Sequence, residues 1–419
     1  MLALKEDTML GNIPGDWKVK PLKGLLKEHH PGDWGADGGP NMYRVIRSTN
    51  LTNEGRLNLS DVASRALKPE KAAFLELHKN DILLERSGGG PDQPVGRVGF
   101  VKEDLPGSAF SNFLHMLRPD PEQINPNYLK WVLWRINQTG RIVRLEQQTT
   151  QLRNLHFRDY LTMPLPIPPP AEQAAIARVL DAVDTAIERT RAAVEQAEVL
   201  TNALLREAFE KLDAVPTKLS KFIVDVRYGT SQASHERGRG FPTLRIPNVS
   251  GDRLSFDDLV FVDLRPIDAE RLALQNGDLL VVRSNGNPNY VGRSAVFRAP
   301  DEQVWVYASY LIRVRLDERL LPDFVNCFLG SSTGRKSVLR RVTTSAGNHN
   351  INTASIKLLT IPIPKTLAEQ QIIIDIANKG RAFADSLKQK LIAQQTLKTA
   401  LLQDLLTGRV RVGATKETA

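Results

Sequence analysis

The sequence predicts an α+β protein made of two copies of one unit, each a mixed α/β domain followed by a long helix. Three observations support this prediction. Segments of the first half recur in the second half at a nearly constant offset. Short apolar or alternating runs bounded by glycine, proline or asparagine favour strands within each copy. A proline-rich stretch and then a long segment poor in helix breakers close each copy, and this change of composition indicates a helix.

The repeat has a period of about 197 residues, which indicates duplicated domains rather than a solenoid, whose repeats are about 20 to 50 residues long. The offset changes by only a residue or two along the chain. The matching segments are 80–87 and 277–284, 95–97 and 291–293, 111–114 and 308–311, and PLPIPPPAEQ at 164–173 and IPIPKTLAEQ at 361–370.

Within each copy, mixed β structure precedes the helix. Strands are expected at 81–84, 96–101, 278–282 and 294–298, where the apolar runs are short. The expected organisation is a first domain over 1–168, a first long spacer helix over 169–213, a second domain over 214–364, a second long spacer helix over 365–410 and a tail over 411–419.

Each long segment carries one apolar stripe. Residues 171–212 contain no glycine or proline, and Gly380 is the only breaker in 367–406. Each segment predicts a helix of about 40 residues, roughly 60 Å long, which needs a partner for its stripe. The first helix enters the second domain and the second helix leaves it, so we expect an antiparallel coiled coil with a pseudo-twofold axis. Such symmetry suits duplex DNA, whose strands are related by twofold axes.

The composition limits the classes of partner and compartment. The formal charge of +9 and the pI near 9.5 suggest a polyanionic partner. No apolar run reaches the roughly 18 to 20 residues of a membrane span, and the opening MLALKEDTML is acidic where a signal peptide would be basic. The single cysteine, Cys327, excludes an internal disulfide and fits a reducing compartment. We therefore expect a soluble, cytoplasmic protein.

The tetrapeptide NPNY, at 125–128 and 287–290, differs by one letter from the box with which amino-methyltransferases grip a flipped base. Asn127 and Asn289 replace the second proline of that box. The richest glycine run, SGGG at 87–90, lacks the GxGxxG spacing of a cofactor turn. His29 and His30 lack further ligands spaced for a metal. The sequence therefore predicts no catalytic, cofactor-binding or metal-binding residues.

The two NPNY copies do not match each other at the repeat offset. Asn125 and Pro126 precede a helical pattern, so we expect a helix start with asparagine as its cap. Residues 287–290 lie in a loop after a predicted strand. That loop either contacts DNA or forms a simple turn.

The boxes PLPIPPPAEQ and IPIPKTLAEQ each head a long helix, and IPGDWKVKPL at 13–22 and LLQDLLTGRVRV at 401–412 accompany them. In these segments, and over nearly its whole length, the chain resembles the specificity subunits of type I restriction-modification systems. The resemblance implies two target-recognition domains that read a split DNA sequence. It also implies helices that dock two adenine-methylating subunits and, in the full complex, ATP-dependent restriction subunits. The chain would then be non-catalytic.

An autonomous DNA-binding regulator is the alternative function. The lack of a helix-turn-helix signature argues mildly against it. Such a regulator would bind its site tightly without partner proteins, whereas a specificity subunit would direct chemistry that its partners perform.

Arginine guanidinium groups, side-chain amides and hydroxyls are the groups that hydrogen-bond to base edges and bind phosphate. Loops that follow the repeated strand place them at matching positions, and the stretches 147–154, 234–239 and 346–352 add amides and cations. For each arginine, a solvated or ion-paired side chain is the alternative. The predicted DNA-binding residues are Arg86, Ser87, Gln93, Arg97, Gln151, Arg237, Arg239, Arg283, Ser284, Asn285, Asn287, Tyr290, Arg293, Asn348, His349 and Asn350.

Glu172, Gln173, Glu369 and Gln370 lie in the first turns of the two long helices. An acidic residue there complements the helix dipole, and helix initiation explains the repeat adequately. The resemblance implies a further role in presenting each helix to the methylating subunit. These four are therefore the predicted partner-binding residues.

Overall fold

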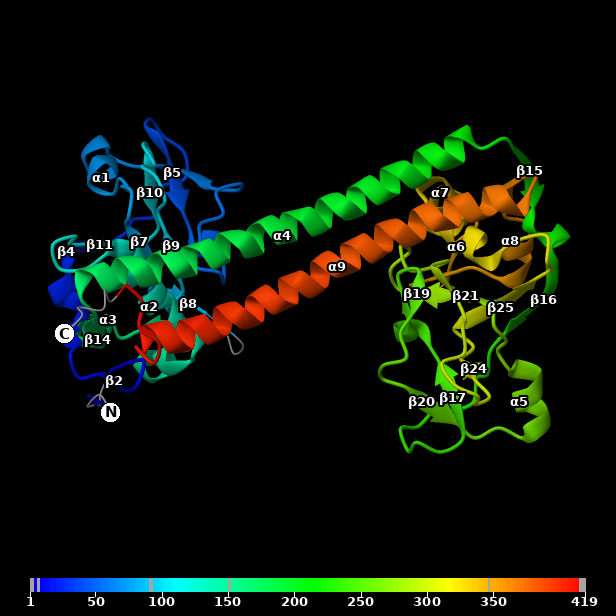
Figure 1. Ribbon diagram of the computed structural model, residues 1–419. Coiled ribbons are helices and arrows are strands. Elements are labelled where there is room, and N and C mark those ends of the chain that lie inside the picture. Colours follow the sequence, from blue (N-terminus) through cyan, green and yellow to red (C-terminus); the bar gives the residue numbers. More distant parts are fainter. Residues whose placement is uncertain (1–3, 6–7, 90–92, 150–151, 346, 414–419) are drawn as a thin grey trace. The chain divides into compact units, whose positions relative to one another are not determined.

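The computed structural model describes residues 1–419 except 1–3, 6–7, 90–92, 150–151, 346 and 414–419. Its contacts divide the chain into two compact units. Unit 1 contains the residues up to Arg189 and those from Lys390 onward, and unit 2 contains Thr190–Gln389. Each unit combines sheets with helices (Figure 1), which confirms the mixed character predicted for the two copies.

A four-stranded antiparallel sheet forms the centre of each unit. Its strands are β4 (Leu26–Pro31), β11 (Leu114–Pro119), β7 (Ile82–Glu85) and β9 (Val98–Phe100) in unit 1, and β16 (Ile223–Tyr228), β25 (Leu311–Leu316), β21 (Leu279–Val282) and β23 (Ser294–Val296) in unit 2, both in spatial order. Leu83 pairs with Met116, and Leu280 pairs with Arg313. The strand register therefore repeats at the offset seen in the sequence.

Further small sheets flank each centre. Unit 1 contains β5 (Met42–Ile46), β6 (Ala63–Ala66) and β10 (Ser108–Phe110) in one sheet, β8 (Ser87–Gly88), β12 (Glu146–Thr149) and β13 (Leu152–Leu155) in another, and the pairs β3 (Lys18–Pro21) with β14 (Pro164–Ile167) and β1 (Leu4–Lys5) with β2 (Ile13–Pro14). The counterparts in unit 2 are β17 (Phe241–Leu244), β20 (Val260–Val262) and β24 (Val306–Tyr307), then β22 (Ser284–Asn285), β26 (Thr343–Ser345) and β27 (Asn348–Asn350), and the pair β15 (Ala214–Lys218) with β28 (Thr360–Pro364). Unit 2 also contains the pair β18 (Val249–Ser250) with β19 (Arg253–Leu254).

Two helices are far longer than the others. They are α4 (Pro170–Lys211) and α9 (Leu367–Leu406), and they confirm the two long helices predicted from composition. The shorter helices are α1 (Pro69–Phe74), α2 (Pro126–Gln138), α3 (Phe157–Thr162), α5 (Pro266–Leu272), α6 (Pro322–Gly330), α7 (Ser332–Leu339) and α8 (Thr353–Lys357). None of the helices in the described part of the chain is both long and apolar enough to cross a membrane.

The two long helices pack against each other in opposite directions. In unit 1 Lys398 Nζ lies 2.5 Å from Asp184 Oδ1, and in unit 2 Lys388 Nζ lies 2.7 Å from Glu198 Oε1. Gly380 does not break α9. A Cβ at Gly380 would lie 2.3 Å from Thr201 Oγ1, so the missing side chain allows the helices to approach. From the first ion pair to the second, the residue number on α9 decreases from 398 to 388 while that on α4 increases from 184 to 198. This confirms that the two helices are antiparallel.

The buried strands and one repeated ion pair hold each centre together. All four residues of β7 and of β21 are buried, as expected for short apolar runs covered on both faces. The buried Asp81 accepts two hydrogen bonds from Arg118, and the buried Asp278 accepts two from Arg315, at 2.7 to 2.8 Å. The bidentate geometry compensates the desolvated carboxylate in both copies.

Unit 1 joins the two ends of the described chain. Arg411 donates to Glu172 Oε1 at 2.6 Å and to Asp16 Oδ2 at 2.8 Å, and Trp17 Nε1 donates to Glu172 Oε2 at 3.1 Å. These carboxylates raise the pKa of Arg411, through hydrogen bonds with Glu172 first and Asp16 second. Leu402 beside them belongs to the apolar core of unit 1, so the end of α9 is part of this unit.

Candidate nucleic-acid interface

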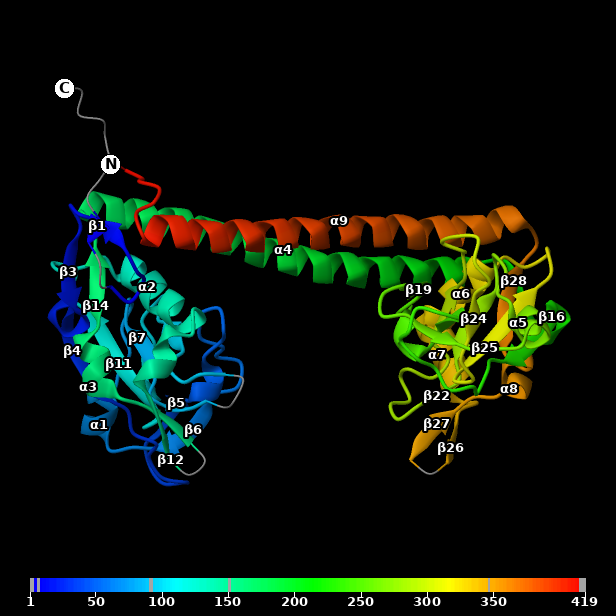
Figure 2. The ribbon, with the colours of Figure 1, turned by 90° about the horizontal axis from the view of Figure 1, so that it is seen from below.

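A hairpin rich in polar side chains pairs with the residues that follow the central strand in each unit. In unit 2, β27 lies between β22 and β26, and Ser284 pairs with Asn350 and Asn285 with His349. In unit 1, β13 lies between β8 and β12, and Ser87 pairs with Asn154. Figure 2 shows the β26–β27 hairpin projecting from unit 2. The fold thus brings together predicted residues that are about 65 positions apart in the sequence.

Arg283 lies between β21 and β22 in unit 2, directly before the residues that pair with the hairpin. We call this arginine, the residues after it and the hairpin the polar edge of the unit. The Arg283 guanidinium carbon lies 4.6 Å from the centre of the Tyr228 ring, and its Nη1 donates to Ser309 O at 3.3 Å. The side chain is half-buried, yet no carboxylate among the described residues pairs with it. Arg283 therefore keeps an uncompensated charge in a fixed position. No sequence pattern pointed to Tyr228, because it lies 55 positions before Arg283 along the chain.

The loop at 285–293 is built from consecutive turns. Asn285 Oδ1 accepts a hydrogen bond from Asn287 N at 2.9 Å, and Asn287 Oδ1 accepts one from Asn289 N at 3.0 Å. Asparagine side chains commonly close turns in this way. The turn alternative therefore describes the backbone of this loop, while Asn287 remains exposed to solvent.

Arg335, which the sequence did not single out, holds this loop from α7. It donates to Val291 O at 2.9 Å and to Asn289 O at 3.2 Å. Burial and then the nearby Arg293 charge lower the pKa of Arg335. The loop consequently rests on a cationic support, and its local potential is positive.

Two arginines at matching positions differ in their surroundings. Arg97 forms a two-pronged ion pair with the buried Glu85, at 2.7 and 2.9 Å, which is the ion-paired alternative for this residue. Val282 replaces that glutamate in unit 2. Arg293 instead stacks on the exposed Tyr290 ring at 4.0 Å and donates to Asn289 O at 3.1 Å. Arg293 is therefore better placed than Arg97 to meet a ligand.

The remaining predicted residues of unit 1 differ in their exposure and in their hydrogen-bond partners. Arg86 is exposed, and among the described residues it has no ion-pair partner. Ser87 Oγ donates to Asn154 Oδ1 at 2.7 Å, and Gln93 Nε2 donates to Asn53 Oδ1 at 2.7 Å. Both keep a further hydrogen-bonding capacity. Gln151 lies outside the described residues.

The hairpin and the preceding loop complete the set in unit 2. Thr344 Oγ1 lies 3.1 Å from His349 Nδ1, and Asn350 Nδ2 donates to the carbonyl oxygen of the exposed Asn348 at 3.2 Å. Arg237 and Arg239 are exposed in the loop between β16 and β17. Within the described part of the chain, neither guanidinium has an ion-pair partner.

The first NPNY copy is structural, as the helix pattern predicted. Asn125 caps α2, and its Oδ1 accepts from Tyr128 N at 3.1 Å. The backbone N–H of Asn125 donates in turn to Gln173 Oε1 at 2.8 Å. In unit 2 the N–H of Leu321 donates to Gln370 Oε1 at the same distance. The repeated glutamine thus ties each long helix to the start of a domain helix.

The four predicted partner-binding residues occupy different surroundings. Gln173, Gln370 and Glu172 are buried, and Glu172 is held by Trp17 and Arg411. Glu369 instead accepts hydrogen bonds from the N–H and the hydroxyl of Thr366 at 2.9 Å. This is a capping box at the start of α9. Only Glu369 of the four presents much of its side chain to solvent.

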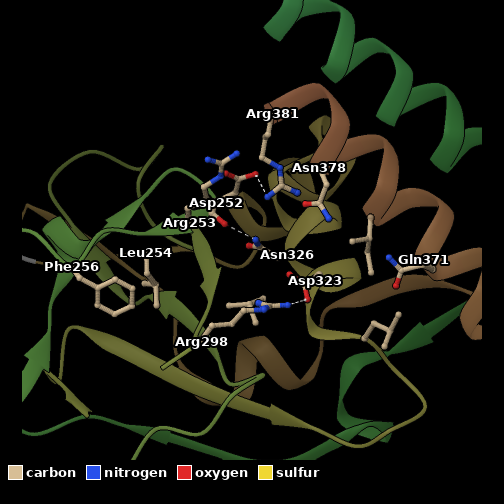
Figure 3. Close-up of a pocket in the computed structure, with 13 residues that line it drawn as sticks. Asp252, Arg253, Leu254, Phe256, Arg298, Asp323, Asn326, Gln371, Asn378 and Arg381 are labelled. Atoms are coloured by element: carbon tan, nitrogen blue, oxygen red, sulfur yellow. Dashed lines mark hydrogen bonds and ion pairs between the residues drawn. The ribbon is translucent and has the colours of Figure 1, made fainter. Parts of the chain in front are cut away.

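Unit 2 also contains a cavity of about 610 Å³ between α9 and the domain. Figure 3 shows Arg381 of α9 reaching toward Asp252, with Asn326 and Asn378 beside them. The Arg381 Nη1 to Asp252 Oδ2 distance is 3.1 Å. None of the predicted DNA-binding residues lines this cavity, so it is separate from the edge described above.

Comparisons with known proteins point to one family. The family model of the type I restriction modification DNA specificity domain matches residues 14–196. The EcoKI specificity subunit of Escherichia coli (strain K12) is 26% identical over 407 residues, which are 91% of this chain and 85% of that protein. The StySPI specificity subunit of Salmonella potsdam is 25% identical over 424 residues, 96% of this chain and 90% of that protein.

Two solved structures share the fold. A chain from a study of complex assembly and conformational transition of the type I R-M system has a TM-score of 0.60 at 15% identity, covering 95% of this chain and 99% of that one. The S subunit from M. genitalium has a TM-score of 0.56 at 16% identity, covering 93% and 96%.

The duplicated domains, the paired long helices and the polar edge built twice define a protein with two equivalent recognition domains. Its relatives over almost the full length are specificity subunits. The family model and these relatives together support a specificity subunit of a type I restriction-modification system, the component that determines the DNA target sequence.

Proposed function

We propose that this chain is non-catalytic and reads a two-part DNA sequence, one part through each domain, for partner subunits that methylate adenine at N6 and restrict DNA. The recognition domains are 1–168 and 214–364, the spacer helices are 169–213 and 365–410, and 411–419 is a tail. The named relatives are specificity subunits, which supports this function and not an autonomous regulator.

One observation carries the proposal. Each unit places an arginine directly after its buried central strand and pairs the next residues with a polar hairpin. These arginines are Arg86 in unit 1 and Arg283 in unit 2. Neither has an ion-pair partner in the described part of the chain, whereas Arg118 and Arg315 on the central sheets each pair with a buried aspartate. Unpaired cations beside amides and hydroxyls match the chemistry of base edges and phosphates.

Each edge would enter the major groove of one half-site. Arg283, Ser284, Asn285, Asn287, Tyr290 and Arg293 read one half-site together with Asn348, His349 and Asn350, and Arg86, Ser87, Gln93, Arg97 and Gln151 read the other. Arg237 and Arg239 bind phosphate from their loop. Phosphate contacts give salt-dependent affinity, and each good bidentate base contact adds about 1 to 3 kcal/mol of discrimination.

The long helices would dock two methylating subunits and, through the full complex, ATP-dependent restriction subunits. Glu172, Gln173 and Gln370 support this docking indirectly, because they fix the start of each helix against its domain. Glu369 caps α9 and presents a partly exposed carboxylate there. The chain itself binds no cofactor in this proposal.

Long-read detection of modified bases in the source cell, with and without this gene, tests the proposed function. We expect loss of N6-methyladenine at one two-part motif that is methylated on both strands. An unchanged map, in cells that express the chain and its methylating partner, would contradict the proposal.

Arg283→Ala tests the assignment of one edge. We expect relaxed recognition in one half-site only, because the second unit alone carries this arginine. Arg265→Ala, which removes an exposed arginine at the N-cap of α5 that pairs with Asp268, is the matched control and should leave the motif intact. Equal loss of binding to unrelated sequences would assign Arg283 to phosphate or to the fold instead.

The length of the helices tests how the half-sites are spaced. Both α4 and α9 are continuous helices, so deleting seven residues, about two turns, from each is expected to change the tolerated gap between half-sites. An unchanged gap in a folded, active complex would reject the role of the helices as a ruler.

A further inference from the structure

An exposed aromatic ring stands beside the leading arginine in both units. Phe113 lies in the turn between β10 and β11, and Tyr310 lies in the turn between β24 and β25. Phe113 is 41% exposed and Tyr310 is 60% exposed, although the next residue of each turn, Leu114 or Leu311, is fully buried. The two rings occupy the same place in the repeat, at its usual offset.

Each ring is fixed to the arginine by the backbone. The carbonyl oxygen of Phe113 accepts a hydrogen bond from Arg86 N at 2.8 Å, and that of Tyr310 accepts one from Arg283 N at 2.8 Å. Burial of the following leucine holds the other side of each turn. The ring and the guanidinium therefore project from one rigid junction in each unit.

A close glycine contact fixes these turns further. A Cβ at Gly32 would lie 2.2 Å from Phe110 O, and a Cβ at Gly229 would lie 2.1 Å from Tyr307 O. Only glycine permits this approach. The same constraint in both units means that the position of the ring, and not merely its chemistry, is repeated.

The surroundings identify the kind of surface that suits these rings. Their neighbours include the arginines and the polar residues that follow them, Ser87 and Ser284, and in unit 2 also the Tyr228 ring on which Arg283 stacks. A docking surface for another protein would need a contiguous apolar patch. Phenylalanine and tyrosine share a flat face, and every base offers a π-face to such a ring whatever the sequence.

We propose that Phe113 and Tyr310 each stack on a base that has left its normal stack within the half-site. This inference rests on the proposed function, since it needs DNA at the two edges. An enzyme that modifies a base in a duplex must take it out of the stack. An inserted side chain that occupies an opened step lowers the cost of that distortion. The two rings prepare the duplex for the methylating partner, while the arginines and amides read the sequence.

The test combines a substitution of the ring with removal of a base, alone and together, and compares their effects on binding. Equilibrium DNA binding is measured for the full chain with its methylating subunits. Duplexes carry the mapped target with one abasic nucleotide at successive positions of a half-site. Tyr310→Leu, which keeps an apolar side chain without a flat ring, should weaken binding of the intact target about fivefold to 100-fold. With the one nucleotide that Tyr310 stacks on made abasic, the same substitution should have no further effect.

Three controls make the result specific. Tyr310→Phe should bind as the unchanged chain does. Phe74→Leu removes a similarly exposed ring, which lies on α1 outside the long helices, and should have no effect. Phe113→Leu should show its coupling in the other half-site only. Neither leucine variant should change the salt dependence, because no charge is removed.

Two outcomes overturn the inference. One is unchanged binding by Tyr310→Leu and Phe113→Leu. The other is a loss of binding that persists at every abasic position, which would assign the rings to the fold of the turn. Failure of the proposed function looks different, because the unchanged chain would then bind the target no better than a scrambled duplex.

Discussion

The two units differ most where each domain meets its long helix. In unit 1, Lys130 Nζ crosses from α2 to Asp181 on α4 at 2.5 Å. Asp184, one turn further along α4, pairs with Arg56 and with Lys398 of α9, both at 2.5 Å. Trp131 packs beside them and donates to Asp181 Oδ1 at 2.8 Å. This joint is closed by charged groups that are largely out of solvent.

In unit 2 the same positions carry other residues and the joint is open. Asn326 and Asn378 stand where unit 1 has Lys130 and Asp181, and Arg381 stands where it has Asp184. These shorter or oppositely charged side chains leave the cavity of about 610 Å³ seen in Figure 3. The glutamine bond to the domain helix is nevertheless the same in both units. The comparison shows that the hydrogen bond from a backbone N–H to the glutamine side chain is common to both joints, whereas the charged residues around it differ.

The largest expected effect comes from the carboxylate in the closed joint. Asp184→Ala leaves the buried Lys398 without its counterion and leaves Arg56 with Glu188 alone, so we expect unit 1 to lose roughly 3 kcal/mol of stability. Arg381→Ala, the matched change in unit 2, removes a pair with the partly exposed Asp252 and should cost under about 1 kcal/mol.

Denaturant unfolding followed by tryptophan fluorescence separates the two units. Trp17, Trp34, Trp131 and Trp134 report on unit 1, and Trp305 reports on unit 2. Variants with Trp305 as the sole tryptophan isolate the second signal. Equal losses for Asp184→Ala and Arg381→Ala would mean that the two joints do not differ in energy.

The shared glutamine should matter equally in both units. Gln173→Ala and Gln370→Ala each leave a partly buried backbone N–H, of Asn125 or Leu321, without its acceptor, which costs about 1 to 3 kcal/mol. Gln371→Ala is the control, because Gln371 is exposed and bonds only to Asp375 among the described residues. It should change the unfolding free energy by a few tenths of a kcal/mol at most. A large effect in only one unit would break the proposed equivalence.

Acid should weaken unit 2 through an arrangement of charges that unit 1 does not reproduce. Asp225 lies between Arg227 and the buried Arg313. Its counterpart in unit 1, Glu28, pairs with Arg118 instead, and His30 and Met116 stand where unit 2 has those two arginines. Burial raises the pKa of Asp225, but hydrogen bonds and charge from the two arginines outweigh it and lower the pKa to about 2. Its stabilising effect is complete above the ordinary pKa of 3.8 and disappears as pH falls through about 2.

The shift corresponds to about 2 kcal/mol of stability. Thermal unfolding of unit 2 at pH 2 to 5, followed at Trp305, measures it. Asp225→Asn should flatten the pH dependence in this range. An equally steep dependence in that variant would assign the acid sensitivity to other carboxylates.

The smallest expected effect comes from a surface ion pair of the open joint. Arg253 pairs with Asp385 at 2.5 Å, with about half of each side chain exposed. Arg253→Ala should cost at most about 1 kcal/mol and become harmless in high salt. A larger loss that resists salt would show that the open joint depends on this pair, contrary to the comparison.

Local patterns predicted the fold well, since the long helices, the central strands and the Asn125 cap depend on neighbours in sequence. The exact partners of side chains could not be predicted in the same way. Gln173 binds Asn125 N across 48 residues, and its box suggested only helix initiation. The predicted edge residues Ser284 and Asn350 do pair through the hairpin. The sequence offered no sign that Glu85 would neutralise Arg97, because this depends on strand register.

The attachment of Arg411 to Glu172 and Asp16 has a consequence for synthesis on the ribosome. Unit 2 is one continuous stretch, so all its residues can leave the ribosome before the chain is finished. Unit 1 must wait, because Leu402, Leu405 and Leu406 complete its core and are made only after the whole of unit 2. The domain that is translated first is therefore the last to become whole, and until then its unfinished apolar surface is exposed to aggregation or to chaperones.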